Sequence, residues 1–255
     1  MIQFLKTHSI CVFLSLVLLF SIAGNLYLGN KALFYYTSLN ALRLDPIEQD
    51  FYPHEDLLPS DTIRVVMLGD SRALAWPSLK YPNVEQYNRG IHGQTSLQIR
   101  SRFRQHVASL HPDIVIFQFG INDFKTIGIF PKQKQKIIVN CIQNLDALIQ
   151  EALSIKAKVI LTTTVPAGPI SLLRKAVWSE DTQDAVREFN KYMHTINKKD
   201  VFVLDTIEIV QNSDGTIPSS MYTDELHLHE KAYSKLNIRL EEMLKEITTT
   251  SAKEY

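Results

Sequence analysis

The sequence contains little cysteine and no excess of charge, and each shortage excludes a class of protein. Its 255 residues include two cysteines, Cys11 and Cys141. Both lie among apolar residues, so they are expected to be small buried hydrophobes rather than parts of a disulfide framework. Lys plus Arg and Asp plus Glu both number 27, so the formal net charge is zero. With no basic surplus or stripe, the chain lacks the electrostatic footprint of a nucleic-acid binder. No cluster of Cys, His and Asp has metal-ligand spacing, so no metal site is predicted.

The longest apolar run lies at the N-terminus. Residues 9–28 contain no charged residue, and lysines flank the run at Lys6 and Lys31. About 20 apolar residues are enough to cross a bilayer. The segment is therefore either a signal anchor, with the catalytic part outside the cytoplasm, or a signal peptide cleaved after Ala23. The run continues past Ala23, which favours the anchor. Membrane attachment, or secretion after cleavage, is expected.

The rest of the chain divides into a linker and one α/β domain. Residues 1–30 form the anchor or signal segment, 31–60 the linker and 61–250 the domain. Short apolar runs predict strands at 63–68, 84–88, 113–119, 158–163 and 201–204. Helical periodicity is found between or after them, at 95–109, 132–154, 181–197 and 230–247. Strands that alternate with helices predict a parallel sheet covered on both faces, and the more polar 84–88 suits an edge strand.

Several short polar segments follow these strands or precede the last helix. They are Gly69-Asp70-Ser71-Arg72, Asn88-Arg89-Gly90-Ile91-His92-Gly93, Gly120-Ile121-Asn122-Asp123 and Asp224-Glu225-Leu226-His227. In open parallel sheets, ligands bind at the carboxyl ends of the strands, so all of the segments could open onto one edge. Each by itself also fits a helix cap or a turn. Taken together, they offer a hydroxyl, glycine N–H groups, a neutral amide, and a histidine three residues after a carboxylate.

In this order and after these elements, the segments resemble the conserved blocks of the SGNH (GDSL-like) hydrolases. The resemblance covers roughly residues 61–240. It implies a flavodoxin-like three-layer α/β/α sandwich with a five-stranded parallel sheet and no cofactor. It also implies a role for particular residues: Ser71 as nucleophile, His227 as base, Asp224 as the carboxylate that orients it, and Ser71, Gly90 and Asn122 as the oxyanion hole.

The sequence departs from the family pattern at two positions. Arg72 stands where the name motif has leucine, a variation that is expected not to affect the chemistry. His229 stands where asparagine often follows the catalytic histidine. His227 is favoured as the base because only it has an aspartate, Asp224, three residues before it.

The function that the resemblance implies is hydrolysis of carboxylic esters through an acyl-enzyme. Small-molecule, lipid and glycan esters all remain open as substrates. An alternative is a membrane-tethered O-acyltransferase that acts on cell-envelope glycans, and a further one is a binding module that has lost its activity. Residues 166–178 are a candidate substrate-lining loop, with helix packing as the competing interpretation.

Overall fold

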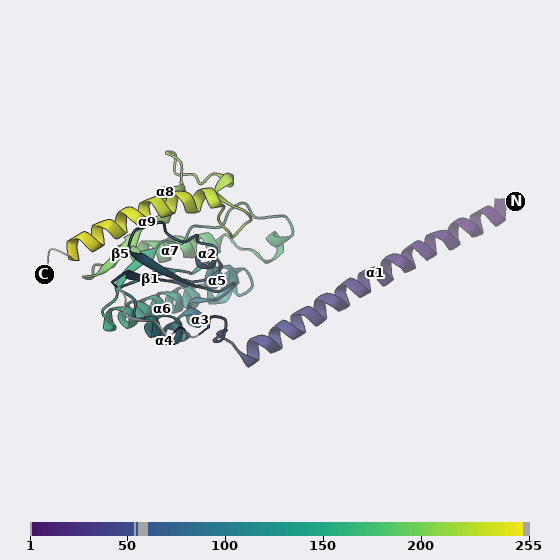
Figure 1. Ribbon diagram of the computed structural model, residues 1–255. Helices are drawn as coiled ribbons and strands as arrows, with labels where there is room; N and C mark the ends of the chain where they lie inside the picture. Colours follow the sequence, from purple (N-terminus) through teal and green to yellow (C-terminus); the bar gives the residue numbers. More distant parts are fainter. Residues whose placement is uncertain (1, 54, 56–60, 252–255) are drawn as a thin grey trace. The chain divides into compact units, whose positions relative to one another are not determined.

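A computed structural model describes residues 2–53, 55 and 61–251 of the chain (Figure 1). It divides into two compact units, Met1–Glu48 and Gln49–Tyr255. Residues 54 and 56–60 of the predicted linker lie outside the described residues.

The first unit is dominated by one helix, α1 (Ile2–Leu44). From His8 onward it is long and apolar enough to cross a membrane, and none of its most apolar window is buried. Such a helix fits a membrane anchor or a signal sequence. It continues well past residue 30, where the linker was predicted to begin, and ends just before Asp45-Pro46, because a proline disfavours helical backbone at the residue before it. Cys11 is exposed on α1, contrary to the expectation that it is buried.

The second unit is built on a five-stranded sheet in the order β2-β1-β3-β4-β5. The strands are β1 (Ile63–Gly69), β2 (Val84–Gly90), β3 (Ile114–Gln118), β4 (Lys158–Thr162) and β5 (Val201–Leu204). All neighbouring strands pair in parallel, and β2 lies at an edge as predicted. This order reverses direction between β1 and β3, and that switch point is where such sheets bind ligands.

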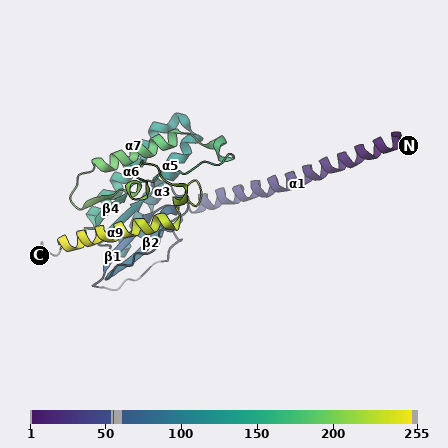
Figure 2. The same ribbon diagram turned by 90° about the horizontal axis from the view of Figure 1, so that it is seen from above.

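Helices cover both faces of the sheet and give the predicted three layers (Figure 1). One face packs on α3 (Ser96–Ser101), α4 (Phe103–His106), α5 (Ile121–Phe124), α6 (Lys134–Ser154) and α7 (Asp181–Thr195). The other face packs on α2 (Ser71–Leu74), α8 (Thr206–Val210) and α9 (Glu230–Ser251). The 3-10 turns are η1 (Ala108–Leu110), η2 (Lys125–Gly128), η3 (Pro131–Gln133), η4 (Arg174–Val177) and η5 (Ser219–Met221). Seen from above, α7 and α9 lie well apart from each other (Figure 2).

The two faces follow from the alternation of side chains along each strand. In β1, Val66 and Leu68 enter one core, and Val65 and Met67 enter the other. Cys141 is fully buried on α6 as expected. Burial on both faces explains why the central strands are continuous apolar runs in the sequence.

The helix predicted over 95–109 is broken in the structure at Arg102. There the backbone leaves helical geometry (φ −101°, ψ 4°). The buried Arg102 side chain donates to the Gly69 carbonyl at 2.8 Å and to Gln94 Oε1 at 2.6 Å. The break thus lets α3 and α4 pack separately while Arg102 ties them to the end of β1.

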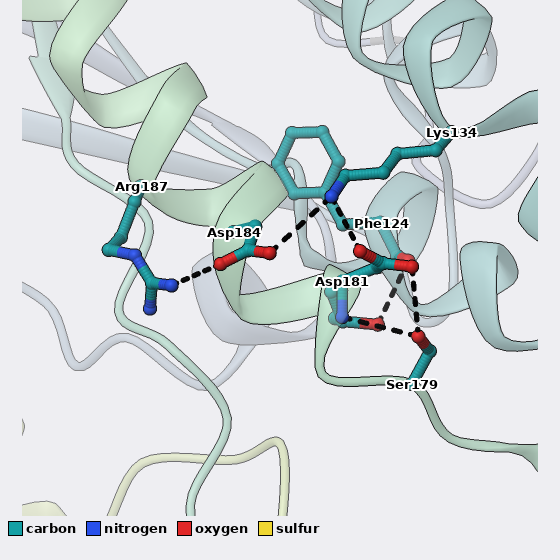
Figure 3. A network of polar contacts seen from close by, with 7 residues as sticks. Phe124, Lys134, Ser179, Asp181, Asp184 and Arg187 are labelled. Carbon is teal, nitrogen blue, oxygen red and sulfur yellow. Dashed lines mark hydrogen bonds and ion pairs between the residues drawn. The ribbon is translucent and has the colours of Figure 1, made fainter.

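An ion-pair cluster joins the beginnings of α6 and α7 (Figure 3). Lys134 Nζ lies 2.6 Å from Asp181 Oδ1 and 3.4 Å from Asp184 Oδ2. Both aspartates lie in the first turn of α7, where the helix dipole favours negative charge. Because these side chains are substantially exposed, the cluster contributes little to stability.

Candidate active site

Ser71 begins α2 directly after the end of β1. Asp70 caps this short helix, because its Oδ1 accepts a hydrogen bond from Arg72 N at 2.8 Å. The Asp70 N–H donates to the Gln118 carbonyl at 3.1 Å, which fixes the turn to the end of β3. The Ser71 residue is 7% exposed. As the first helical residue, Ser71 has a backbone N–H without an intrahelical acceptor.

The loop before α9 brings a histidine to this serine. His227 Nε2 lies 3.0 Å from Ser71 Oγ, and His227 Nδ1 lies 2.7 Å from Asp224 Oδ2. Asp224 Oδ1 also accepts from the N–H groups of Leu226 at 2.7 Å and His227 at 2.8 Å. One aspartate therefore both shapes the turn and orients the imidazole. This arrangement has the geometry of a hydroxyl–imidazole–carboxylate series that can activate a nucleophile.

The hydrogen bonds to Asp224 also set its charge. Partial burial opposes ionisation, but the bonds from the His227 ring and from the backbone outweigh it and lower the pKa of Asp224 to about 2. The carboxylate is therefore ionised at neutral pH and can stabilise an imidazolium on His227.

Asn122 lies at the start of α5, across the switch point from Ser71. Its Nδ2 donates to the Gln94 carbonyl at 3.1 Å and to Asp70 Oδ2 at 3.3 Å. Its Oδ1 accepts from Lys125 Nζ at 2.5 Å, which fixes the amide with its nitrogen on the Asp70 side. An oxyanion that bound this amide would have to replace the longer contact, the one to Asp70.

The N–H of Gly90 is engaged in another hydrogen bond, and this argues against the oxyanion role expected for it. Its N–H already donates to Asn88 Oδ1 at 2.9 Å. A Cβ at this position would lie 2.1 Å from Leu74 N, so the glycine is needed for the close approach of β2 and α2. This packing explains the residue without any contact to a substrate.

Gly93 has the properties that Gly90 lacks. It is exposed, with φ +72° and open space around it, and its N–H has no hydrogen-bond acceptor among the described residues. It directly precedes Gln94, whose carbonyl contacts Asn122. Its signal in the sequence was the pair of glycines at and just after the end of β2, which only the geometry distinguishes.

The second histidine of the last segment lies outside this series. His229 Nδ1 accepts from Lys231 N at 3.2 Å at the start of α9, as expected for a residue at the helix entrance.

Arg72 was expected to be a tolerated variation without effect on the chemistry, and the structure places its side chain in the protein interior. Its side chain is 1% exposed and donates to the carbonyls of Leu226 at 2.7 Å and Val165 at 2.5 Å. A charged residue directly after the serine was the only signal in the sequence for this contact.

The candidate substrate loop, 166–178, lies beside the Asp224 turn. Gly168 N donates to the Glu225 carbonyl at 2.9 Å, and Arg174 pairs with the Glu225 carboxylate at 3.7 Å. Leu172 and Leu173 are 82% and 92% exposed. Trp178, at the end of the loop, is partly buried and packs against the core beneath α6 and α7.

The comparisons with known proteins agree with this fold. Residues 69–235 match the model of the GDSL-like Lipase/Acylhydrolase family. A GDSL-like lipase from Bacteroides thetaiotaomicron is 20% identical with a TM-score of 0.57, covering 80% of this chain and 97% of its own. A structure from Streptococcus pneumonia, described as a platelet activating factor, is 20% identical with a TM-score of 0.65. The match covers 84% of this chain and 99% of that structure's chain.

An acetylxylan esterase from Geobacillus stearothermophilus, solved as a catalytic mutant, is 16% identical with a TM-score of 0.50, covering 71% of this chain and 93% of its own. No protein of curated function matches the chain by sequence. Because the family model spans well over half of the chain, the chain belongs to the GDSL-like lipase/acylhydrolase family.

Proposed function

We propose that this hydrolase cleaves carboxylic esters through a covalent acyl-enzyme on Ser71. The observation that carries the proposal is the hydrogen-bonded series from Ser71 Oγ through His227 to Asp224, at 3.0 and 2.7 Å. Ser71 Oγ attacks the ester carbonyl carbon while His227 Nε2 takes its proton. Asp224 accepts the Nδ1–H and so keeps the tautomer that leaves Nε2 free to act as a base.

The oxyanion of the tetrahedral intermediate needs donors next to Ser71. We assign these to the N–H groups of Ser71 and Gly93 and to the Asn122 amide, with Gly93 replacing Gly90. As the intermediate collapses, the alcohol leaves with the proton held on His227. Water then attacks the acyl group, with His227 again acting as base, and Ser71 is regenerated.

The acyl group of the substrate is expected to contact the loop at 166–178. Leu172 and Leu173 present apolar surface to solvent, while Glu225 holds the loop next to the catalytic turn. The side chains of His227 and Asp224 are 38% and 46% exposed, so the centre is open and accessible to a bulky ester. With α1 as a membrane anchor, the domain is proposed to act outside the cytoplasm.

The test is hydrolysis of acyl esters of graded chain length by the full-length protein in detergent. Ser71→Ala and His227→Ala should each abolish turnover without loss of folding, and Ser220→Ala, at an exposed serine, should retain it. Full activity in a folded Ser71→Ala protein would falsify the assignment. Adding a glycan acceptor tests the transferase alternative. If acyl transfer to the sugar hydroxyl is faster than hydrolysis, the sugar rather than water is the natural acceptor.

A further inference from the structure

Arg72 connects the nucleophile to the histidine loop through the interior of the protein. Its backbone follows Ser71 in α2, and its side chain is buried. Nε donates to the Leu226 carbonyl at 2.7 Å, and Nη1 donates to the Val165 carbonyl at 2.5 Å. These acceptors belong to two other loops, one before His227 and one after β4.

The contact to Leu226 acts on the peptide unit that leads into His227. The carbonyl of that unit accepts from Arg72 Nε at 2.7 Å, and its N–H donates to Asp224 Oδ1 at 2.8 Å. Both polar groups of one peptide are therefore held, from opposite ends. The backbone that carries the imidazole cannot rotate without breaking one of these bonds.

A buried cation at this point requires compensation. Burial lowers the pKa of Arg72, and the charge of the fully buried Asp70 is the largest influence that opposes this shift. The guanidinium also donates to the two carbonyls, and hydrogen bonds from a charged donor are stronger than those between neutral groups. Tyr233 Oη donates to the Arg72 carbonyl at 2.9 Å and holds the residue's backbone against α9. Because a leucine here would bury apolar surface without desolvating a charge, packing alone does not account for the arginine.

We propose that Arg72 is a positioning residue, whose guanidinium holds the Leu226–His227 peptide so that the imidazole stays within reach of Ser71. The inference rests on the proposed function, and it deepens that function by explaining how the base is held. A displacement of about 1 Å in a reacting group can cost roughly 100-fold in rate, so fixing this peptide has a direct catalytic consequence.

The experiment compares Arg72→Ala, Arg72→Lys and a matched control, Arg64→Ala. Arg64 also donates from a mostly buried side chain to a backbone carbonyl, that of Leu110 at 2.8 Å, but it lies near the start of β1, at the opposite end of the strand. Arg72→Ala should lower kcat at least tenfold with KM within about twofold, since the base is displaced and the substrate surface is unchanged. Arg64→Ala should lower thermal stability and leave kcat within about twofold.

The response of kcat to added guanidinium ion distinguishes a positioning role of Arg72 from a purely structural one. The ion should partly restore kcat to Arg72→Ala by occupying the vacated space, and leave Arg64→Ala unaffected. Arg72→Lys should be intermediate, because one ammonium cannot reproduce a planar fork between two carbonyls. A folded Arg72→Ala protein with near-normal kcat would overturn the proposal, as would guanidinium that restores stability without restoring kcat.

A spectroscopic measurement separates failure of this inference from failure of the proposed function. The low-field proton resonance of the His227 Nδ1–H···Asp224 bond can be followed without any substrate. Its loss in Arg72→Ala and its return with guanidinium would support the positioning role even if Ser71→Ala proved active. An unchanged resonance in Arg72→Ala would overturn it.

Discussion

His227 Nε2 lies 3.0 Å from Ser71 Oγ, although the two residues are 156 positions apart in the chain. The sheet topology makes this contact possible. Ser71 follows β1, an interior strand of the sheet, and the loop before α9 returns to the same edge after the last strand. The loop is then held by Arg72, which follows the nucleophile directly.

Asp224→Asn tests the orienting carboxylate. The Asn Oδ1 can still accept from the backbone N–H groups of Leu226 and His227, so the turn should persist, but its NH₂ would face His227 Nδ1 and favour the wrong tautomer. We expect kcat to fall by about 10²–10³-fold, less than for a buried triad aspartate because Asp224 is 46% exposed. Initial rates and circular dichroism check this result, and an Asp224→Asn protein with wild-type kcat would remove the carboxylate from the mechanism.

The pKa of Asp224 predicts how the rate depends on pH. Because that pKa is about 2, Asp224 stays ionised throughout the range in which the protein is assayed. A fall in kcat/KM between neutral pH and about pH 4 should therefore not come from protonation of Asp224. The same low pKa makes the carboxylate favour folding above its unfolded pKa of about 3.9, and this contribution is lost as pH falls toward 2.

Asp123 gives the opposite dependence of stability on pH. Burial raises its pKa to about 6, against the opposing hydrogen bonds from the Ser96 hydroxyl and N–H. The folded state then binds the proton more tightly than the unfolded state, so Asp123 lowers the free energy of unfolding as pH rises from about 4 to about 6, by roughly 3 kcal/mol in total. Asp123→Asn should flatten this part of the curve in urea unfolding at several pH values. An identical pH dependence in the variant would show that Asp123 titrates normally.

Gly90 and Gly93 should differ in how much an added methyl group costs. Gly90→Ala places a Cβ 2.1 Å from Leu74 N, so the free energy of unfolding should fall by about 3 kcal/mol. Gly93→Ala meets open space and should cost only about 1 kcal/mol, from its positive φ. Chemical denaturation of both variants checks the difference. Equal and small effects would mean that the close approach at Gly90 is not needed.

Leu172→Ala and Leu173→Ala test the substrate loop. Both side chains are largely exposed, so stability should stay within about 0.5 kcal/mol of the wild type. If they contact the acyl chain, KM for long-chain esters should rise up to about tenfold and KM for acetyl esters should not change. Ile238→Ala, an exposed position on α9, is the matched control. Equal KM changes for short and long esters would reject the contact.

The sheet could be predicted because its strands are buried on both faces and read as apolar runs. The strand bounds 63–68 and 158–163 differ by one residue at one end from those of β1 and β4. The prediction of one helix over 95–109 was wrong in its middle. The side chain of Arg102 turns inward to the carbonyl of Gly69, which is distant in the sequence.

Only those site residues that belong to short sequence motifs could be predicted. Ser71, Asp224 and His227 were placed by their motifs. The proposed choice between Gly90 and Gly93 needed the Asn88 contact, since the two glycines lie only three residues apart, one at the end of β2 and one just after it. The role of Arg72 depends on a carbonyl 154 positions away, which no local pattern encodes.

The residue that a fluorophosphonate probe modifies identifies the nucleophile of this hydrolase. The full-length protein is labelled, digested and mapped by mass spectrometry, with Ser71→Ala and His227→Ala labelled in parallel. We expect a single adduct on the peptide that contains Ser71, absent in Ser71→Ala and formed much more slowly in His227→Ala. Labelling of a different residue, or equal labelling of the Ser71→Ala protein, would contradict it.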